Sequence, residues 1–322
     1  MIADKVPHPA TGPDPHLSIL ETRRVLRIAR GGRLQRWLGP ALRGLAGGRL
    51  KARVCRHPVA DQIARGRWER CEGCPLMRGC AYGETIEADS PTGAKSDALR
   101  PVVIAPAYPC PEVGRVGDLI PVRAAFIGST AAAHSSEFWE SLRIGGADPG
   151  LGLGQERVLF DVLPGTEPDR TEEVAVPADP TAVPGIVPRV RMVLTSPLIL
   201  DVRVADRSRR LVERPTLANL LWKWDSLDAL FRDYGTSLPD GAVDRVKELA
   251  AGVPTLATAF GVESQTKSSH RSGDRGEVSW VTGWGEYGPV PAGLLPWLRL
   301  AGRLHVGTHR VAGAGGWEVE AE

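Results

Sequence analysis

The chain has 322 residues, of which 42% are hydrophobic and 24% are charged, and its formal net charge at pH 7 is +2. This length suits two domains of ordinary size, and the hydrophobic content is sufficient for packed cores. No apolar run approaches the roughly eighteen residues of a membrane span, and the first fifteen residues lack the apolar core of a signal peptide. We therefore expect a cytoplasmic protein with no membrane partner.

The low net charge conceals a strongly basic segment near the N-terminus. Between Thr22 and Ala60 there is no acidic residue, whereas the same segment holds ten arginines and one lysine. Arginine suits bidentate contacts with phosphate, although a GC-rich genome produces the same preference for arginine. The segment predicts an electrostatic footprint for nucleic acid, and a solvated helix face is the alternative.

The first half of the chain alternates between strand and helix patterns. A strand over 17–28 is followed by a turn and by a helix that begins at Pro40, because proline fits the first turn of a helix. A glycine-rich loop at 145–154 then precedes the last strand of this half. The other predicted elements are strands at 100–106, 118–127 and 157–163 and a helix at 135–144.

The second half repeats this order. Residues 163–189 are rich in proline, threonine and acidic residues without apolar periodicity, so we expect a linker or a mobile excursion there. After it we predict a strand at 190–204, helices at 216–234 and 240–252, a hairpin at 277–284 and 287–290, a helix at 294–304, a glycine loop and a closing strand.

These patterns predict an α+β protein with two tandem ferredoxin-like (βαββαβ) domains, each an antiparallel sheet covered by helices. The expected parts are a disordered tail at 1–16, a first domain at 17–165, a linker at 166–189 and a second domain at 190–322. We expect the first domain to carry a cysteine-rich insertion at about 52–100.

Four of the five cysteines fall within this insertion, with the spacing C-x15-C-x2-C-x5-C. They are Cys55, Cys71, Cys74 and Cys80. Four thiolates can surround a tetrahedral zinc ion, and a cytoplasmic location disfavours structural disulfides. We predict a structural zinc site that staples a loop-rich insertion, with free or redox-labile thiols as the alternative.

The C-terminal glycine loop has three glycines within four positions, Gly313, Gly315 and Gly316. Glycine has no Cβ, so backbone amides in such a loop can approach a phosphate closely. Basic residues stand beside it: Arg303, His305, His309 and Arg310. The loop predicts a phosphate contact, and a flexible turn before the last strand is the alternative.

Several stretches, taken in order, resemble the CRISPR repeat-processing endoribonucleases of the RAMP superfamily. Residues 305–317 resemble the glycine-rich signature that ends these proteins, and 71–87 resembles a cysteine-containing insertion found in one branch. The other stretches that carry the resemblance are 39–44, 150–154 and 194–198. The chain departs from the family at Thr308 and Gly316, where members usually have basic residues.

The resemblance implies two ferredoxin-like domains that bind CRISPR repeat RNA and cut precursor CRISPR RNA within repeats, with no cofactor for catalysis. The 2′-hydroxyl would attack the neighbouring phosphate and leave a 2′,3′-cyclic phosphate and a 5′-hydroxyl. A non-catalytic subunit that binds CRISPR RNA inside an effector complex, together with other subunits, is the alternative. A zinc-containing enzyme with nucleotide-binding glycine loops is a third hypothesis, but no Walker-type lysine follows either loop.

Histidine suits proton transfer near neutral pH, so we expect the catalytic residue among His57, His270 and His309. The expected RNA-binding residues combine basic side chains with the glycines that flank them. They are Arg33, Arg36, Arg43, Gly44, Arg271, Arg303, Arg310, Gly313, Gly315 and Gly316.

Overall fold

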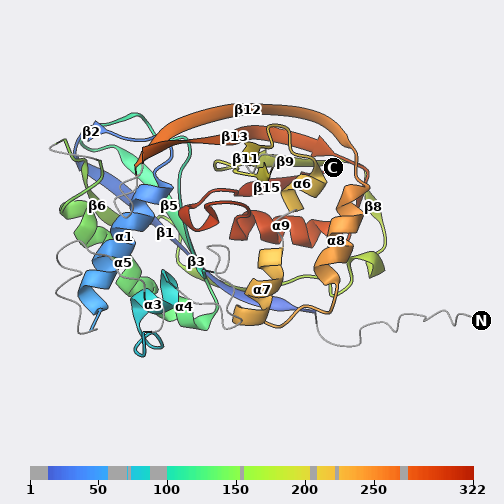
Figure 1. Ribbon diagram of the computed structural model, residues 1–322, viewed down its shortest axis with the longest axis horizontal. Helices are drawn as coiled ribbons and strands as arrows, with labels where there is room; N and C mark the ends of the chain where they lie inside the picture. The colour runs from blue at the N-terminus through green and yellow to red at the C-terminus, as the bar shows by residue number, and fades with distance from the viewer. Residues whose placement is uncertain are drawn as a thin grey trace, which may run out of the picture.

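Two antiparallel sheets with their helices stand side by side in the computed structural model of the protein (Figure 1). The structure describes residues 14–56, 71, 74–87, 100–152, 156–203, 209–221, 225–268 and 275–322. Within these ranges, no helix is long and apolar enough to cross a membrane.

The first sheet has the strand order β3-β5-β1-β6, with every neighbouring pair antiparallel. Its strands are β1 (His16–Arg30), β3 (Val102–Pro106), β5 (Leu119–Ile127) and β6 (Leu159–Pro164). The helices α1 (Gly39–Val54) and α5 (Ser135–Ala147) pack against each other and share one core with this sheet. The connection of strands and helices is βαββαβ, so the first ferredoxin-like unit is confirmed.

Helix α1 begins where the sequence predicts, because Pro40 occupies its first turn. Its apolar residues recur every four positions and bury one face: Leu38, Leu42, Ala46 and Leu50. Shorter elements complete this domain: β2 (Gly32–Arg33), α3 (Ala81–Thr85), β4 (Val113–Gly114) and α4 (Ser129–Ala133).

The segment expected to be a linker instead extends the first sheet. Strand β7 (Arg170–Ala175) pairs antiparallel with the beginning of β1, from His16 to Glu21. Its side chains are mostly exposed, so it has no apolar pattern to predict it. Beyond it lie a short helical turn η2 (Pro180–Ala182) and β8 (Ile186–Val187), which pairs with β14 (Val290–Pro291).

The second sheet has the order β12-β13-β9-β15, which is again that of a βαββαβ unit. Its strands are β9 (Val190–Leu194), β12 (Thr255–Ser268), β13 (Arg275–Tyr287) and β15 (Trp317–Ala321). Four helices belong to this unit: α6 (Leu217–Leu221), α7 (Asp225–Tyr234), α8 (Ala242–Ala251) and α9 (Leu294–Leu304). A small hairpin joins β10 (Asp201–Arg203) to β11 (Arg209–Leu211).

The prediction of a hairpin between strands at 277–284 and 287–290 was wrong, because the strand at 277–284 pairs with a different strand. Strand β13 pairs along its whole length with β12, and together they form a long ribbon that arches across both domains (Figure 1). The first twelve residues of β12 are exposed or only half-buried, because β12 is the edge of the sheet. No buried alternation therefore marks this strand in the sequence.

The two domains share a hydrophobic core. The N-terminal residues of β1, Leu17 and Ile19, are fully buried in one cluster with Phe231 of α7 and Leu298 of α9. Alternate residues further along β1, such as Leu26, belong to the cluster under α1 and α5. The two faces of the first sheet therefore serve different neighbours, which fixes the position of the second domain.

The C-terminal glycine loop lies at the contact between the domains. The amide of Gly315 donates to Pro197 O at 2.7 Å, and the amide of Gly316 donates to Ser196 Oγ at 2.8 Å. The amides of Gly313 and Ala314 also donate within the chain, to carbonyl oxygens in the same loop. All four residues are buried. The loop is a packed joint whose amides already have acceptors inside the protein, and the phosphate contact stays a prediction.

Gly315 supplies a sharp test of this joint. Its φ is +81°, and a Cβ there would lie 1.7 Å from Val306 O. We expect Gly315→Ala to lower the free energy of unfolding by about 2–5 kcal/mol, from backbone strain and overlap together. The measurement is urea denaturation followed by tryptophan fluorescence.

Gly44→Ala is the matched control. Gly44 is exposed in α1, and a Cβ there would have no atom within 4 Å. The same substitution should stabilise the protein by about 0.5–1 kcal/mol, because alanine favours the helix. Equal effects at the two positions would contradict the packed joint.

Candidate nucleic-acid interface

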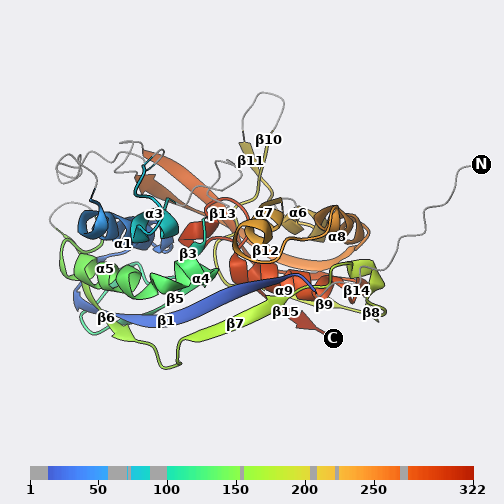
Figure 2. The ribbon, with the colours of Figure 1, turned by 90° about the horizontal axis from the view of Figure 1, so that it is seen from below.

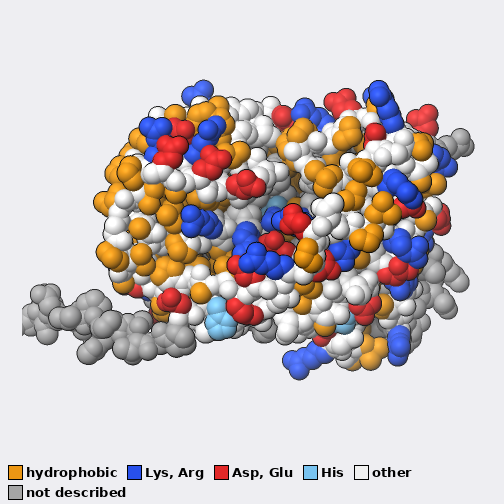
Figure 3. Space-filling view, turned by 180° about the vertical axis from the view of Figure 1, so that it is seen from behind, with side chains coloured by type: hydrophobic (Ala, Val, Ile, Leu, Met, Phe, Trp, Pro, Cys, Tyr) orange, Lys and Arg blue, Asp and Glu red, His pale blue; other side chains and the backbone are white. Residues whose placement is uncertain are grey.

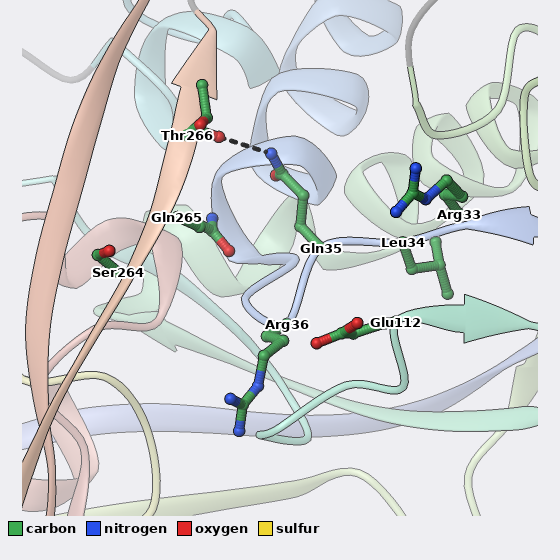
Figure 4. Close-up of a pocket in the computed structure, with 8 residues that line it drawn as sticks. All are labelled: Arg33, Leu34, Gln35, Arg36, Glu112, Ser264, Gln265 and Thr266. Carbon is green, nitrogen blue, oxygen red and sulfur yellow. Dashed lines mark hydrogen bonds between the residues drawn. The ribbon is translucent and has the colours of Figure 1, made fainter.

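An open pocket lies between the two domains, on the side of the β12–β13 ribbon (Figure 4). We call it the interdomain pocket; its volume is about 530 Å³. One wall is the chain between β2 and α1, and the other is β12. The lining residues are Arg33, Leu34, Gln35, Arg36, Glu112, Ser264, Gln265 and Thr266.

Two side-chain amides hold the walls of the pocket together. The Gln265 side chain pairs with the backbone of Trp37: its Oε1 accepts from Trp37 N and its Nε2 donates to Trp37 O, both at 3.3 Å. Gln35 Nε2 donates to Thr266 O at 3.0 Å. Strand β12 is therefore attached to the first domain by hydrogen bonds at two successive residues.

Trp37 lies at the centre of this contact between the domains. Its indole is buried, donates to Ala312 O at 3.1 Å, and packs edge-on against Trp280 with ring centroids 5.8 Å apart. The His309 ring also packs edge-on against Trp37, with ring centroids 6.0 Å apart. One buried aromatic residue thus connects the start of α1, the β12–β13 ribbon and the glycine loop.

A polar network fixes Arg36 at the pocket. Arg36 Nη1 lies 3.2 Å from Glu263 Oε2 on β12. The Tyr108 hydroxyl donates to the same carboxylate at 2.6 Å and accepts from Trp280 Nε1 at 2.8 Å. Burial raises the pKa of Tyr108, and the hydrogen bond to Glu263 raises it further, so the hydroxyl remains a donor.

Most arginines of the basic segment have partners inside the molecule. On β1, Arg24 pairs with Asp169 at 2.7 Å, Arg27 pairs with Asp161 at 2.8 Å, and Arg23 pairs with Glu167. Figure 3 shows basic and acidic side chains next to one another on the face behind that of Figure 1. The basic segment therefore offers less unpaired positive charge to nucleic acid than its sequence suggests.

The predicted RNA-binding arginines separate into two groups. Arg33 is exposed and makes no ion pair or side-chain hydrogen bond with the part of the chain that the structure describes. The side chain of Arg36 keeps 42% exposure beside Glu263. Arg43 instead donates to Ile86 O at 3.0 Å, and Arg303 pairs with Glu21 and Glu172.

Arg310 is a correction to the expected site. It is only 1% exposed, and its guanidinium donates to Leu304 O at 3.2 Å and to Arg100 O at 2.8 Å. Its guanidinium is enclosed among carbonyl oxygens at the joint between the domains. Gly313, Gly315 and Gly316 are buried at the same joint, whereas Gly44 is exposed on α1.

Of the three predicted catalytic histidines, His309 lies within the described residues. His309 is half-buried beside Trp37, the residue that follows Arg36. His57 and His270, like Arg271, lie outside the described residues. His305 is buried, and Arg123 Nη2 lies 2.7 Å from its Nε2. Burial, then the charges of neighbouring arginines, lowers the pKa of His305, so this ring is neutral and structural.

The cysteines do not form a metal centre in the described geometry. Among the described residues, no three His, Cys, Asp or Glu side chains are placed to hold a metal ion. Burial raises the pKa of the Cys71 thiol to about 11, which favours the protonated form. The Cys74 amide donates to Cys71 O at 2.9 Å, as in a turn. Structural zinc stays a prediction, and elemental analysis of the purified protein decides it.

No sequence pattern marks the four residues that hold Arg36 and Trp37 in place, which are Tyr108, Glu263, Gln265 and Trp280. Three of them belong to β12 and β13, and β12 was not predicted as a strand. Tyr108 lies in the loop after β3 and meets Glu263 across 155 positions of sequence. No local pattern marks such a contact.

The Tyr108 hydroxyl provides a test of the network. Tyr108→Phe leaves Glu263 and the Trp280 indole without this partner, and we expect a loss of about 1.5–3 kcal/mol in the free energy of unfolding. Urea denaturation measures it. Tyr234→Phe is the matched control, because the Tyr234 hydroxyl has no hydrogen-bond partner in the described ranges. A loss at Tyr234 as large as at Tyr108 would contradict the network.

Comparisons with known proteins agree with this architecture. The family model AF_1859_N, described as an N-terminal domain, matches residues 17–179, which is half of the chain. A search of curated proteins finds no match. Among solved structures, the Cas6 (TTHB231) product complex has a TM-score of 0.53 at 14% identity, covering 93% of this chain and 100% of that chain.

A second structure, the partial Cas6-RT-Cas1–Cas2 complex, has a TM-score of 0.52 at 12% identity and covers 95% of this chain. The match covers 46% of that longer chain. At such identities the likeness shows the fold. The chain therefore belongs to the family that the AF_1859_N model describes, and its fold is the tandem ferredoxin-like fold of the Cas6 proteins.

Proposed function

We propose that the protein binds CRISPR repeat RNA and cleaves precursor CRISPR RNA within its repeats. The observation that carries this proposal is an open, arginine-lined pocket between two domains whose fold matches the full length of the chain in a Cas6 product complex. Because the resemblance of the sequence motifs points to the same family, fold and sequence support one function.

Binding begins with the arginines of the interdomain pocket. Arg33 has no internal partner in the described ranges, so its guanidinium has no ion pair to give up when it binds an RNA phosphate. Arg36 must share its charge between a phosphate and Glu263. Of the two, Arg33 contributes the larger electrostatic attraction, while Arg36 is the more firmly positioned.

Cleavage in this proposal is an internal transfer at phosphorus. The 2′-oxygen forms a bond to the neighbouring phosphorus, the bond from phosphorus to the 5′-oxygen breaks, and the products are a 2′,3′-cyclic phosphate and a 5′-hydroxyl. A base takes the proton of the 2′-hydroxyl, and an acid gives a proton to the leaving 5′-oxygen. Cationic side chains stabilise the charge on the phosphorane.

His309 is the candidate proton-transfer residue that the described structure supports best. It lies beside Trp37, at the N-terminal end of α1. His57 and His270, which lie outside the described residues, are the alternative candidates.

A non-catalytic role in binding CRISPR RNA is the second candidate function. It is favoured by the glycine loop, whose amides at 313–316 are all used inside the molecule. A loop of this kind offers no backbone donors to a developing phosphorane. Such a protein would hold CRISPR RNA together with other subunits of an effector complex.

A cleavage assay separates the two functions. With repeat RNA in EDTA, we expect a 2′,3′-cyclic phosphate product and a 5′-hydroxyl product. His309→Ala should lower the single-turnover rate constant by about 10²-fold or more, because it removes a proton-transfer group. Its dissociation constant for the RNA should stay within about twofold of the wild type.

Each other result has a defined meaning. Binding without any cleavage by the wild type would leave the non-catalytic role. Cleavage at the normal rate by His309→Ala would exclude this histidine and direct the same test to His57 and His270. If the wild type failed to bind repeat RNA, both functions would be wrong.

The salt dependence of binding tests the role of Arg33. Arg33→Ala should reduce the slope of log K against log salt concentration by about 0.7, the value for one phosphate contact on a single strand. Arg170→Ala is the control, since Arg170 is exposed on β7, across the molecule from the β12–β13 ribbon (Figure 2). An unchanged slope in Arg33→Ala would contradict a phosphate contact there.

A further inference from the structure

Some polar groups of the interdomain pocket already make hydrogen bonds within the protein, and others can still bind a ligand. Gln265 uses both ends of its amide on the backbone of Trp37. The Ser264 hydroxyl donates to Glu277 Oε1 on the neighbouring strand. The Gln35 Nε2 group donates to Thr266 O. These hydrogen bonds build the walls, so these groups are not available to a ligand without loss of the walls.

Two acceptors remain on the first-domain wall of the pocket. In the described part of the chain, the Glu112 carboxylate makes no ion pair and no side-chain hydrogen bond, and the residue is exposed. Figure 4 shows this carboxylate beside Arg36, at the edge of the pocket. Gln35 Oε1 is the second acceptor: its amide orientation is fixed because Nε2 must donate to a carbonyl oxygen.

The Glu112 carboxylate requires an explanation within an RNA-binding surface. A carboxylate repels phosphate and lowers the benefit of the arginines that line the same pocket. Carboxylates can, however, accept hydrogen bonds from base edges, and this gives specificity that phosphate contacts cannot give. An acceptor-only group and an arginine without an internal partner in the described ranges line the same pocket, so they fit one nucleotide, with its phosphate on the arginine and its base on the carboxylate.

The acceptors select among the four bases. The Watson–Crick edge of guanine presents two adjacent donor groups, N1–H and the 2-amino group, which match the two oxygens of a carboxylate. Adenine and cytosine place a ring-nitrogen acceptor beside their one amino group, and that acceptor would face the second carboxylate oxygen. Uracil has one donor between two carbonyl oxygens. Guanine alone satisfies both oxygens of Glu112.

We propose that the interdomain pocket holds one unpaired guanosine nucleotide of the RNA, with Glu112 accepting from its N1–H and 2-amino groups and Arg33 binding a phosphate next to it. The volume of about 530 Å³ is within the range of small-ligand sites. Leu34 contributes an apolar side chain to the same wall. The inference rests on the proposed RNA binding and names the nucleotide that this site takes.

Short single strands test the pocket directly. The probes are fluorescein-labelled seven-nucleotide RNAs of uridine with guanosine, adenosine, cytidine or uridine at the centre, titrated with the full-length protein at one salt concentration and followed by anisotropy. The wild type should bind the guanosine strand about tenfold more tightly than the others. A strand with central inosine, which lacks the 2-amino group, should fall between them.

Three variants assign the effect to the pocket. Glu112→Gln should reduce the guanosine preference to less than twofold while the all-uridine strand binds as well as before or better. Arg33→Ala should weaken all strands by a similar factor. Glu320→Gln is the control, because Glu320 is exposed on β15 and does not line the pocket; it should keep the wild-type preference.

The outcomes separate this inference from the proposed function. Equal binding of all strands by the wild type, with repeat RNA still bound, would overturn the guanosine pocket alone. A guanosine preference that survives in Glu112→Gln would do the same, since the base would then be read elsewhere. If neither the strands nor repeat RNA bound, the pocket and the proposed function would both be wrong.

Discussion

Direct contact between the backbones of the two domains is the constraint on which the rest of the structure depends. A Cβ on Gly39, at the start of α1, would lie 1.7 Å from Ala312 O, and one on Gly313 would lie 2.5 Å from Ile104 O of β3. Glycine is required because backbone from the other domain occupies the side-chain direction. The joint sets α1 and the glycine loop against each other. The second sheet is then placed so that β12 runs past residues 33–37 and forms the second wall of the interdomain pocket.

The fold could be predicted where burial leaves a pattern in the sequence. Pro40 and the apolar residues that follow it indicate α1, and the repeated order of elements indicates two βαββαβ units. Strands β7 and β12 could not be predicted in this way. Both lie at an edge with side chains largely in solvent, so their hydrogen bonds to β1 and β13 stabilise them without an apolar alternation. The glycines at 313–316 show a different limit: the sequence indicates that something approaches the backbone closely, but not whether it is a phosphate or another part of the chain.

Some residues of the candidate site could also be predicted from the sequence, and others could not. Arg33 and Arg36 could be found from local charge, because they lie in a segment without acidic residues. What distinguishes them is tertiary: Glu263 comes from β12, and the residue that supports it, Tyr108, comes from the loop after β3. The sequence also could not show that the β1 arginines meet carboxylates in the segment 161–169, since those acidic residues follow more than a hundred positions later. Net charge over a window overestimates the free charge whenever the opposing strand supplies the partners.

Contacts inside the molecule also determine which groups could take part in the proposed cleavage. The amides of the glycine loop are used inside the chain, and Arg310 is buried among carbonyl oxygens. In the proposed chemistry, side chains would stabilise the charge on a phosphorane, and Arg36 at the interdomain pocket is a candidate. Arg36 is held by Glu263 in a fixed position, and a positioned cation loses little entropy when charge develops beside it. A cation held in this way would interact more strongly with a doubly charged phosphorane than with the singly charged phosphate of bound RNA, because the attraction grows with the charge. Arg33, which makes no ion pair in the described part of the chain, would contribute to binding without being held in one position, so binding and cutting need not depend on the same residue.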